Sequence, residues 1–219
     1  MIERQQVVVI GLGVFGETIA KELTRLGHDV LGVDIDESRV DRLAETITHA
    51  VIADVTNEHA LKELDVSQYD IGVVAIDEDF EAAILATMQL LDLGIEKVWA
   101  KAITSQHHRI LDKIGATRII GPEFEMGVRV AQELNYPMVN NYIDLGDDEF
   151  IVEIFATDSL DGTALADLAG ETEAEVKLLL VKRGSDTTIN PSNDFVLRKD
   201  DQIVLAGTLT EFRKLADRV

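Results

Sequence analysis

Short apolar runs alternate with longer segments of helical periodicity through the first two-thirds of the chain. The runs are rich in valine and isoleucine and do not alternate with polar residues, which is typical of parallel strands covered on both faces. Strands that alternate with helices predict the α/β class, here a Rossmann-like doubly wound parallel sheet. Six strands are predicted, at Val7–Gly11, Val30–Asp34, Ala50–Ala53, Ile71–Ala75, Val98–Ala102 and Arg118–Gly121.

The pattern changes after residue 121. Pro122 can occupy the first turn of a helix, which is predicted over Glu123–Leu134 and whose apolar residues do not form a single stripe. A connection through Asn140 and Asn141 is expected to follow. From Glu149 onward, short strands joined by turns predict a small α+β domain. We therefore expect a nucleotide-binding N-terminal domain over 1–121, a crossover helix and linker over 122–139, and a C-terminal domain over 140–219.

A glycine motif, Gly11–Gly16, joins the first predicted strand to the first predicted helix. Gly11 permits a tight turn, Gly13 lets backbone amides approach phosphate oxygens, and Gly16 lets the helix pack close to the strand. Asp34 ends the second strand, where its carboxylate can accept hydrogen bonds from ribose hydroxyls and would repel a 2′-phosphate. This context predicts an adenine nucleotide, with NADP disfavoured. A glycine-rich turn without a ligand is the simpler alternative.

The composition excludes several classes of partner. The 219 residues include 20 basic and 41 acidic side chains, for a formal net charge of −21, so nucleic acid and anionic membrane surfaces are poor partners. No apolar stretch approaches the roughly 20 residues of a membrane-spanning helix, which argues against direct membrane insertion. The absence of cysteine excludes disulfides and thiolate metal sites and fits a cytoplasmic protein.

Several segments occur in a characteristic order along the chain, namely Gly11–Gly16, Val33–Glu37, Thr48–Thr56, Val73–Ile76, Trp99–Ala102, Lys113–Ile120 and Pro122-Glu123. In this order they resemble the cytoplasmic regulatory subunits of Ktr/Trk-type potassium uptake systems, which carry RCK (regulator of potassium conductance) domains of the TrkA-N and TrkA-C type. The resemblance covers essentially the whole chain.

The resemblance implies a regulatory protein and not an enzyme. Such subunits are cytoplasmic homo-oligomers, an octameric ring built from dimers in the Ktr branch, held at the inner face of the membrane by a membrane-embedded potassium translocating subunit. ATP or ADP, and in some members NAD or NADH, binds the Rossmann-like part, sometimes with Mg²⁺ or another cation, and changes the shape of the ring. The resemblance therefore implies a nucleotide-operated gate.

The candidate binding residues combine the motif with the resemblance. Lys101 would supply positive charge over the phosphates, and Asp54 would meet the adenine edge. The resemblance marks Glu123 as a metal ligand at a subunit interface. A surface lysine, a turn or N-cap aspartate and a first-turn helix acid are the structural alternatives for these three. The full set of binding candidates is Gly11, Gly13, Val14, Phe15, Gly16, Asp34, Asp36, Asp54, Val55, Ala75, Ile76, Asp77 and Lys101.

Two departures from the family pattern bear on the ligand. Val14 stands where relatives that discriminate ATP commonly have arginine, and Asp77 stands where relatives often have glycine. Both changes lower the expected affinity for a triphosphate and leave NAD(H), ADP and AMP open. The acidic stretch Glu171–Glu175 lies where relatives that bind cyclic di-AMP carry a basic residue, so we do not expect that effector.

Two other functions remain open from the residues alone. An NAD-dependent oxidoreductase would need a group that moves a proton in its second domain. Residues 140–219 contain no cysteine, no histidine and a single tyrosine, Tyr142. A stand-alone adenine-nucleotide sensor acting on another partner is the remaining alternative.

Overall fold

The computed structural model of the chain describes residues 3–135, 139–165, 176–208 and 210–212. The chain divides into two compact units, Met1–Met126 and Gly127–Val219. Each unit has its own buried hydrophobic core, so each can be understood by itself.

The first unit is built around a six-stranded parallel sheet, as the apolar runs predict. The strands follow the order β3-β2-β1-β4-β5-β6, which is the Rossmann order. Every neighbouring pair in this sheet is parallel. The sequence-based fold class is therefore confirmed. The strands are β1 (Gln6–Ile10), β2 (Asp29–Asp34), β3 (His49–Ile52), β4 (Ile71–Val74), β5 (Lys97–Lys101) and β6 (Arg118–Ile120).

Helices connect these strands, and short polar side chains begin most of them. A side-chain oxygen of Asp36, Asn57, Asp79 or Thr104 accepts a backbone hydrogen bond at the start of the second to fifth helix. No helix in the described part of the chain has both the length and the apolar composition needed to cross a bilayer. The helices are α1 (Val14–Arg25), α2 (Glu37–Leu43), α3 (Glu58–Glu63), α4 (Phe80–Asp92), α5 (Ser105–Ile114) and α6 (Pro122–Asn135), with a 3-10 turn, η1, at Val66–Gln68.

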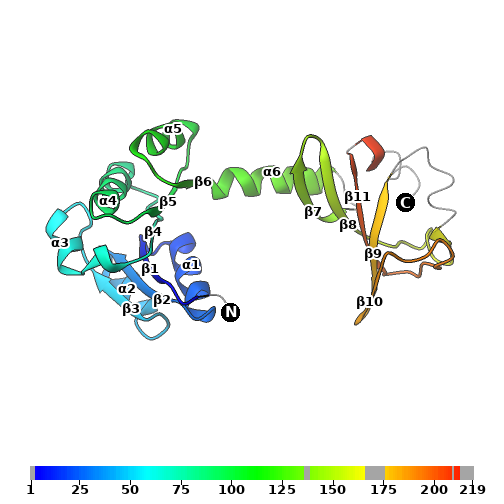
Figure 1. Cartoon of the computed structure of the whole chain (residues 1–219), viewed down its shortest axis with the longest axis horizontal. Coiled ribbons are helices and arrows are strands. Elements are labelled where there is room, and N and C mark those ends of the chain that lie inside the picture. Colours follow the sequence, from blue (N-terminus) through cyan, green and yellow to red (C-terminus); the bar gives the residue numbers. More distant parts are fainter. Residues whose placement is uncertain (1–2, 136–138, 166–175, 209, 213–219) are drawn as a thin grey trace. The chain divides into compact units, whose positions relative to one another are not determined.

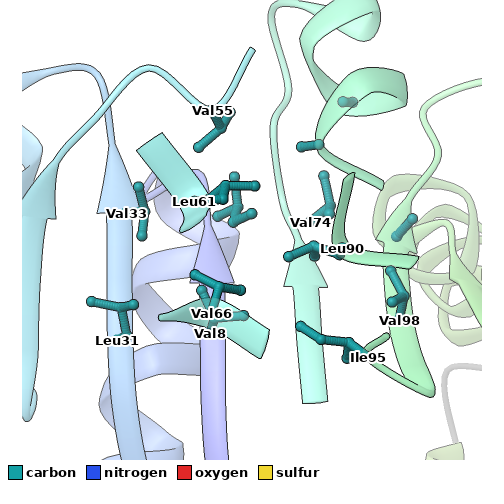
Figure 2. Close-up of a cluster of buried hydrophobic side chains, with 14 of the residues drawn as sticks. Val8, Leu31, Val33, Val55, Leu61, Val66, Val74, Leu90, Ile95 and Val98 are labelled. Atoms are coloured by element: carbon teal, nitrogen blue, oxygen red, sulfur yellow. The ribbon is translucent and has the colours of Figure 1, made fainter. Parts of the chain in front are cut away.

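Both faces of the sheet are buried, because alternate strand residues belong to different cores. In β1, Val8 joins a core that contains side chains of α3, α4 and α5, whereas Val9 joins a core that contains side chains of α1 and α2. Figure 2 shows the first core, in which Leu61 and Leu90 pack among the strand valines. Burial on both sides explains why these strands read as unbroken apolar runs.

The strand order of the sheet reverses at β1: the chain first adds strands on one side of β1 and then adds the remaining strands on the other side. The strands β2 and β3 lie on one side of β1, and β4, β5 and β6 lie on the other (Figure 1). The loops after β1 and β4 therefore leave the same edge of the sheet in opposite directions. Ligands of open α/β sheets bind in the crevice that forms at this point, outside the carboxyl ends of the strands.

The second unit contains a five-stranded antiparallel sheet in the order β10-β9-β11-β8-β7. One face is apolar: Phe150, Val152 and Ile154 of the fourth strand in that order are buried, together with Ile203 and Leu205 of its neighbour. This alternation is typical of a sheet with one face on the core. The strands are β7 (Val139–Gly146), β8 (Glu149–Phe155), β9 (Lys177–Arg183), β10 (Asp186–Ile189) and β11 (Gln202–Thr208).

The connection expected through Asn140 and Asn141 is wrong, because both residues lie in strand β7. This strand lies at the edge of the sheet, and its pairing with β8 is interrupted by two register shifts. Asparagine is uncommon in strands, and an irregular edge strand lacks the alternation of apolar and polar residues by which strands are predicted. The turn to β8 places Asp147 and Asp148 at φ 53° and 64°, which suits a tight hairpin.

An ion pair fixes two segments of the second unit to each other. The Asp201 side chain is 1 % exposed, and it accepts hydrogen bonds from Nε and Nη2 of Arg183 at 2.8 and 2.7 Å. The backbone N–H of Arg198 also donates to it at 2.8 Å. The hydrogen bonds from Arg183 outweigh burial and hold the pKa of Asp201 below its usual value.

We expect Asp201→Ala to lower the free energy of unfolding of the second unit by about 2–4 kcal/mol, because it removes the partner of a semi-buried guanidinium. Amide hydrogen exchange of β9 and β11 measures the loss. Lys199→Ala removes an exposed pair with Asp158 and should lower the free energy of unfolding far less, because water screens that pair. Since the folded pKa of Asp201 is lowered, its stabilisation is present above about pH 4 and is lost as the pH falls further. Equal effects of the two variants would contradict this account.

Candidate functional site

A cleft of about 360 Å³ opens at the carboxyl ends of β1, β2 and β4 and at the start of α4. It therefore lies at the point where the strand order reverses, where the glycine motif predicts a nucleotide. Its walls combine small and apolar side chains with acidic ones. The lining residues are Ile10, Gly11, Gly13, Val33, Asp34, Ile35, Arg39, Ala53, Asp54, Val55, Thr56, Ala75, Ile76, Asp77, Glu78, Asp79 and Ala82.

The glycine loop is packed too closely to carry side chains at two positions. Gly11 has φ +90°, and a Cβ there would lie 2.8 Å from the backbone of Ala75. A Cβ on Gly16 would lie 1.9 Å from the carbonyl oxygen of Gly11. The first hydrogen bond of α1 runs from the N–H of Glu17 to the carbonyl of Gly13. The N–H groups that precede it in the helix have no carbonyl partner within the helix, so they can bind an anion.

Asp34 ties this loop to the end of β2. It is 6 % exposed; its Oδ2 accepts the N–H of Leu12 at 2.6 Å, and its Oδ1 accepts the N–H of Asp36 at 2.9 Å. Each carboxylate oxygen has a second lone pair, so the same group can still accept from ribose hydroxyls at the cleft wall. The side chain thus supports the loop and lines the cleft with acceptor capacity to spare.

Two other predicted acids have local structural partners. The Asp36 side chain accepts the N–H of Ser38 at 2.8 Å and caps α2, and it does not line the cleft. Asp54 does line the cleft, and it accepts the hydroxyl and the N–H of Thr56 at 2.6 and 2.9 Å. The hydroxyl hydrogen bond lowers the pKa of Asp54. Asp54 is therefore a charged turn residue, whereas Asn57 caps α3.

Lys101 is buried at the end of β5 and is paired with two carboxylates. Its side chain is 4 % exposed, and its Nζ lies 2.5 Å from Oδ1 of Asp77 and 2.6 Å from Oε1 of Glu123. The Phe15 ring centroid lies 5.5 Å from Nζ. Burial alone would lower the pKa of Lys101, but the hydrogen bonds to both carboxylates raise it. The hydrogen bond from Lys101 also lowers the pKa of Glu123.

Sequence reasoning missed Arg39, which is the only cation among the described residues that line the cleft. Its guanidinium lies 3.5 Å from Asp34, 3.6 Å from Asp36 and 3.7 Å from Glu78. The available signal was an arginine three residues after the aspartate that starts a helix, because this spacing turns both side chains to one face.

The structure brings most of the predicted binding residues to the cleft. Eight of them line it: Gly11, Gly13, Asp34, Asp54, Val55, Ala75, Ile76 and Asp77. Gly16 packs against Gly11 of the loop, and Lys101 is paired with Asp77, which lines the cleft. The Val14 side chain is 86 % exposed and does not line the cleft. Among the residues that the structure describes, no three His, Asp or Glu side chains gather to hold a metal ion. The stretch Glu171–Glu175 lies outside the described residues.

Comparison with known proteins decides the family. A TrkA-N domain matches residues 7–122, and a TrkA-C domain matches residues 150–219. The chain belongs to the TrkA-N/TrkA-C family. It is 41 % identical to the Ktr system potassium uptake protein A of Bacillus subtilis (strain 168), over 97 % of this chain and 96 % of that protein. It is 38 % identical to the protein of the same name from Vibrio alginolyticus, over 93 % and 92 %. The family predicted from the sequence is confirmed.

Solved structures bear out the fold. The GsuK RCK domain superposes with a TM-score of 0.66 at 17 % identity, and the match covers all of this chain and 48 % of that one. The Kef C-terminal domain of Shewanella denitrificans in an AMP-bound form gives a TM-score of 0.54 at 20 % identity, over 62 % of this chain and 82 % of that one. This TrkA-N/TrkA-C chain thus spans about half the length of the GsuK chain, and at these identities the likeness concerns the fold alone.

Proposed function

We propose that this chain is a cytoplasmic nucleotide-sensing regulatory subunit of a potassium uptake system. The observation that carries the proposal is the 41 % identity to a Ktr system potassium uptake protein, which extends over nearly the full length of both chains. A match of that extent includes both domains. We infer that the chain gates a membrane-embedded translocating subunit and is held at the inner face of the membrane by that partner.

The residues of the cleft fit an adenine nucleotide. The glycine loop offers phosphates the unpaired N–H groups of a helix N-terminus, Asp34 lies at the cleft wall within reach of a ribose, and apolar side chains such as Val55 and Ile76 line the remaining wall. The excess of carboxylates disfavours a triphosphate. We therefore rank ADP and NAD(H) above ATP, and we expect Mg²⁺ or another cation to strengthen binding by neutralising charge.

The proposed mechanism couples ligand shape to assembly. In this mechanism residues 1–121 bind the nucleotide, residues 122–139 couple the two domains, and residues 140–219 form the C-terminal domain. The first strand of the C-terminal domain, β7, begins one residue earlier, at Val139. We infer a homo-oligomeric ring, octameric and built from dimers. A ligand shifts such a ring only by its differential affinity for two shapes, typically about 1–3 kcal/mol for each coupling. Several equivalent sites acting together make a switch.

Thermal unfolding of the full chain with ATP, ADP, AMP, NAD and NADH, with and without Mg²⁺, tests the proposal. A ligand at 100 times its dissociation constant stabilises the native state by about 2.7 kcal/mol, which raises the midpoint by roughly 5–11 °C for a chain of this size. We expect ADP or NADH to give this shift. No shift with any of the five would contradict nucleotide sensing.

Two further measurements separate the alternatives. We expect light scattering to report an oligomer at micromolar protein, because a ring is needed to transmit the ligand signal; a strict monomer would contradict the ring. NADH absorbance should stay constant with small carbonyl substrates, since the proposal assigns the chain no hydride transfer. Turnover would instead favour the oxidoreductase.

A further inference from the structure

A carboxylate of the chain itself lies against the glycine loop. Asp77 follows β4 and lines the cleft, and its Oδ2 lies 3.3 Å from the position that a Cβ on Gly13 would take. Glycine at that position lets an anion approach the backbone closely, and this approach is what a nucleotide phosphate requires. The side chain of Asp77 therefore lies at the position where the second glycine would admit a phosphate.

The same carboxylate neutralises the nearest buried cation. Oδ1 of Asp77 lies 2.5 Å from Nζ of Lys101, and Glu123 lies 2.6 Å from the same nitrogen. The Lys101 side chain is 4 % exposed, so it has little freedom to turn toward another anion. A phosphate that reached Lys101 would have to displace Asp77 or lie beside its negative charge.

We propose, on the basis of the nucleotide-binding function above, that Asp77 competes with the ligand for the phosphate subsite and determines which nucleotides bind. Asp77 acts as an internal anion that the ligand must displace. The negative charge of Asp77 repels phosphate, so it weakens the binding of every phosphate-bearing ligand. The loss of affinity grows as the phosphate charge of the ligand rises. NAD carries fewer phosphate charges than ADP, and ADP carries fewer than ATP. The expected cost of Asp77 therefore rises in that order.

The variant Asp77→Asn tests this competition, with Glu78→Gln as its matched control. Glu78 lines the same cleft and its side chain is 86 % exposed, but it pairs with Arg39 at 3.7 Å and not with Lys101. Both variants remove one negative charge from one wall, and each removes one carboxylate partner from a cation that keeps another: Lys101 keeps Glu123, and Arg39 keeps Asp34 and Asp36. Only Asp77→Asn removes the carboxylate that lies against Gly13.

Calorimetric titration of the full chain at low ionic strength, with EDTA to exclude divalent cations, measures the effect. We expect Asp77→Asn to tighten ADP binding at least ~10-fold, the effect of one close like charge, and to exceed the gain from Glu78→Gln at least ~3-fold. The gain should be larger for ATP than for ADP and smaller for NAD. It should shrink as salt is added, because salt screens the repulsion.

Different outcomes overturn different claims. If the wild type binds ADP and Asp77→Asn binds it no better than Glu78→Gln, the competition is overturned while nucleotide sensing stands. If neither the wild type nor any variant binds a nucleotide, the proposed function fails and the competition fails with it. Asp77→Gly is the second variant, and the fluorescence of Trp99, the only tryptophan, reports whether each variant is folded.

Discussion

Gly16→Ala is expected to lower the free energy of unfolding of the first unit by about 3 kcal/mol or more. The added Cβ would lie 1.9 Å from the carbonyl oxygen of Gly11 and 3.2 Å from Cβ of Ala75. Both neighbours are packed in the loop and at the end of β4, so α1 must move away from the sheet. Overpacking a close-packed site typically costs about 1–3 kcal/mol, and a clash with backbone costs more.

Urea unfolding followed by the fluorescence of Trp99 measures this loss, because Trp99 lies in β5 of the same unit. Gly121→Ala is the matched control. A Cβ on Gly121 would meet its nearest atoms at 3.6 and 3.7 Å, which is ordinary van der Waals contact. We expect that variant to unfold within about 1 kcal/mol of the wild type. A Gly16→Ala protein as stable as the Gly121→Ala protein would show that the loop is not packed as described.

Asp34→Ala is expected to weaken nucleotide binding by about 100-fold or more. The proposed site has this carboxylate accept hydrogen bonds from two ribose hydroxyls, and a hydrogen bond to a charged group contributes about 1.5–3 kcal/mol. The same substitution leaves the N–H groups of Leu12 and Asp36 without their acceptor. We therefore also expect about 1–3 kcal/mol of lost stability in the first unit, so binding is measured at a temperature where the variant is folded.

Asp36→Ala provides the control for the Asp34 experiment. Asp36 lies two residues along the chain and carries the same charge, but its side chain caps α2 and does not line the cleft. Loss of the cap should lower the stability of the first unit slightly and change the dissociation constant by less than about threefold. Calorimetric titration of both variants with nucleotide measures the two dissociation constants. Asp34→Ala binding as tightly as Asp36→Ala would place the ribose contact elsewhere.

The positions of the first six strands along the sequence could be predicted because their signals are local. Each strand is an unbroken apolar run, since it is buried on both faces, and each is followed by a helix. The glycine loop and Asp34 could be found because the spacing of a strand, a turn and a second strand is fixed by the fold. Strand β7 could not, because it is an irregular edge strand with asparagines and carries no comparable pattern.

The charge network of the cleft could not be read from the sequence. Asp77 and Lys101 were predicted near the ligand and Glu123 as a metal ligand at a subunit interface, but the three residues are 24 and 22 positions apart along the chain. Their contact depends on how three separate elements meet at one edge of the sheet. The spacing of Asp36 and Arg39 indicated that these two side chains share a helix face, but it did not show that Arg39 also turns back from α2 toward Asp34. Such contacts depend on side-chain direction, which sequence spacing does not fix.

A crystal structure of the full chain grown with ADP tests the central claim most directly. We predict density for ADP in the cleft, with its diphosphate against the Gly11–Gly16 loop, its ribose hydroxyls within hydrogen-bonding distance of Asp34, and the Asp77 carboxylate moved away from Gly13. A cleft without ADP at saturating ligand, or ADP bound at another place on the chain, would contradict the account.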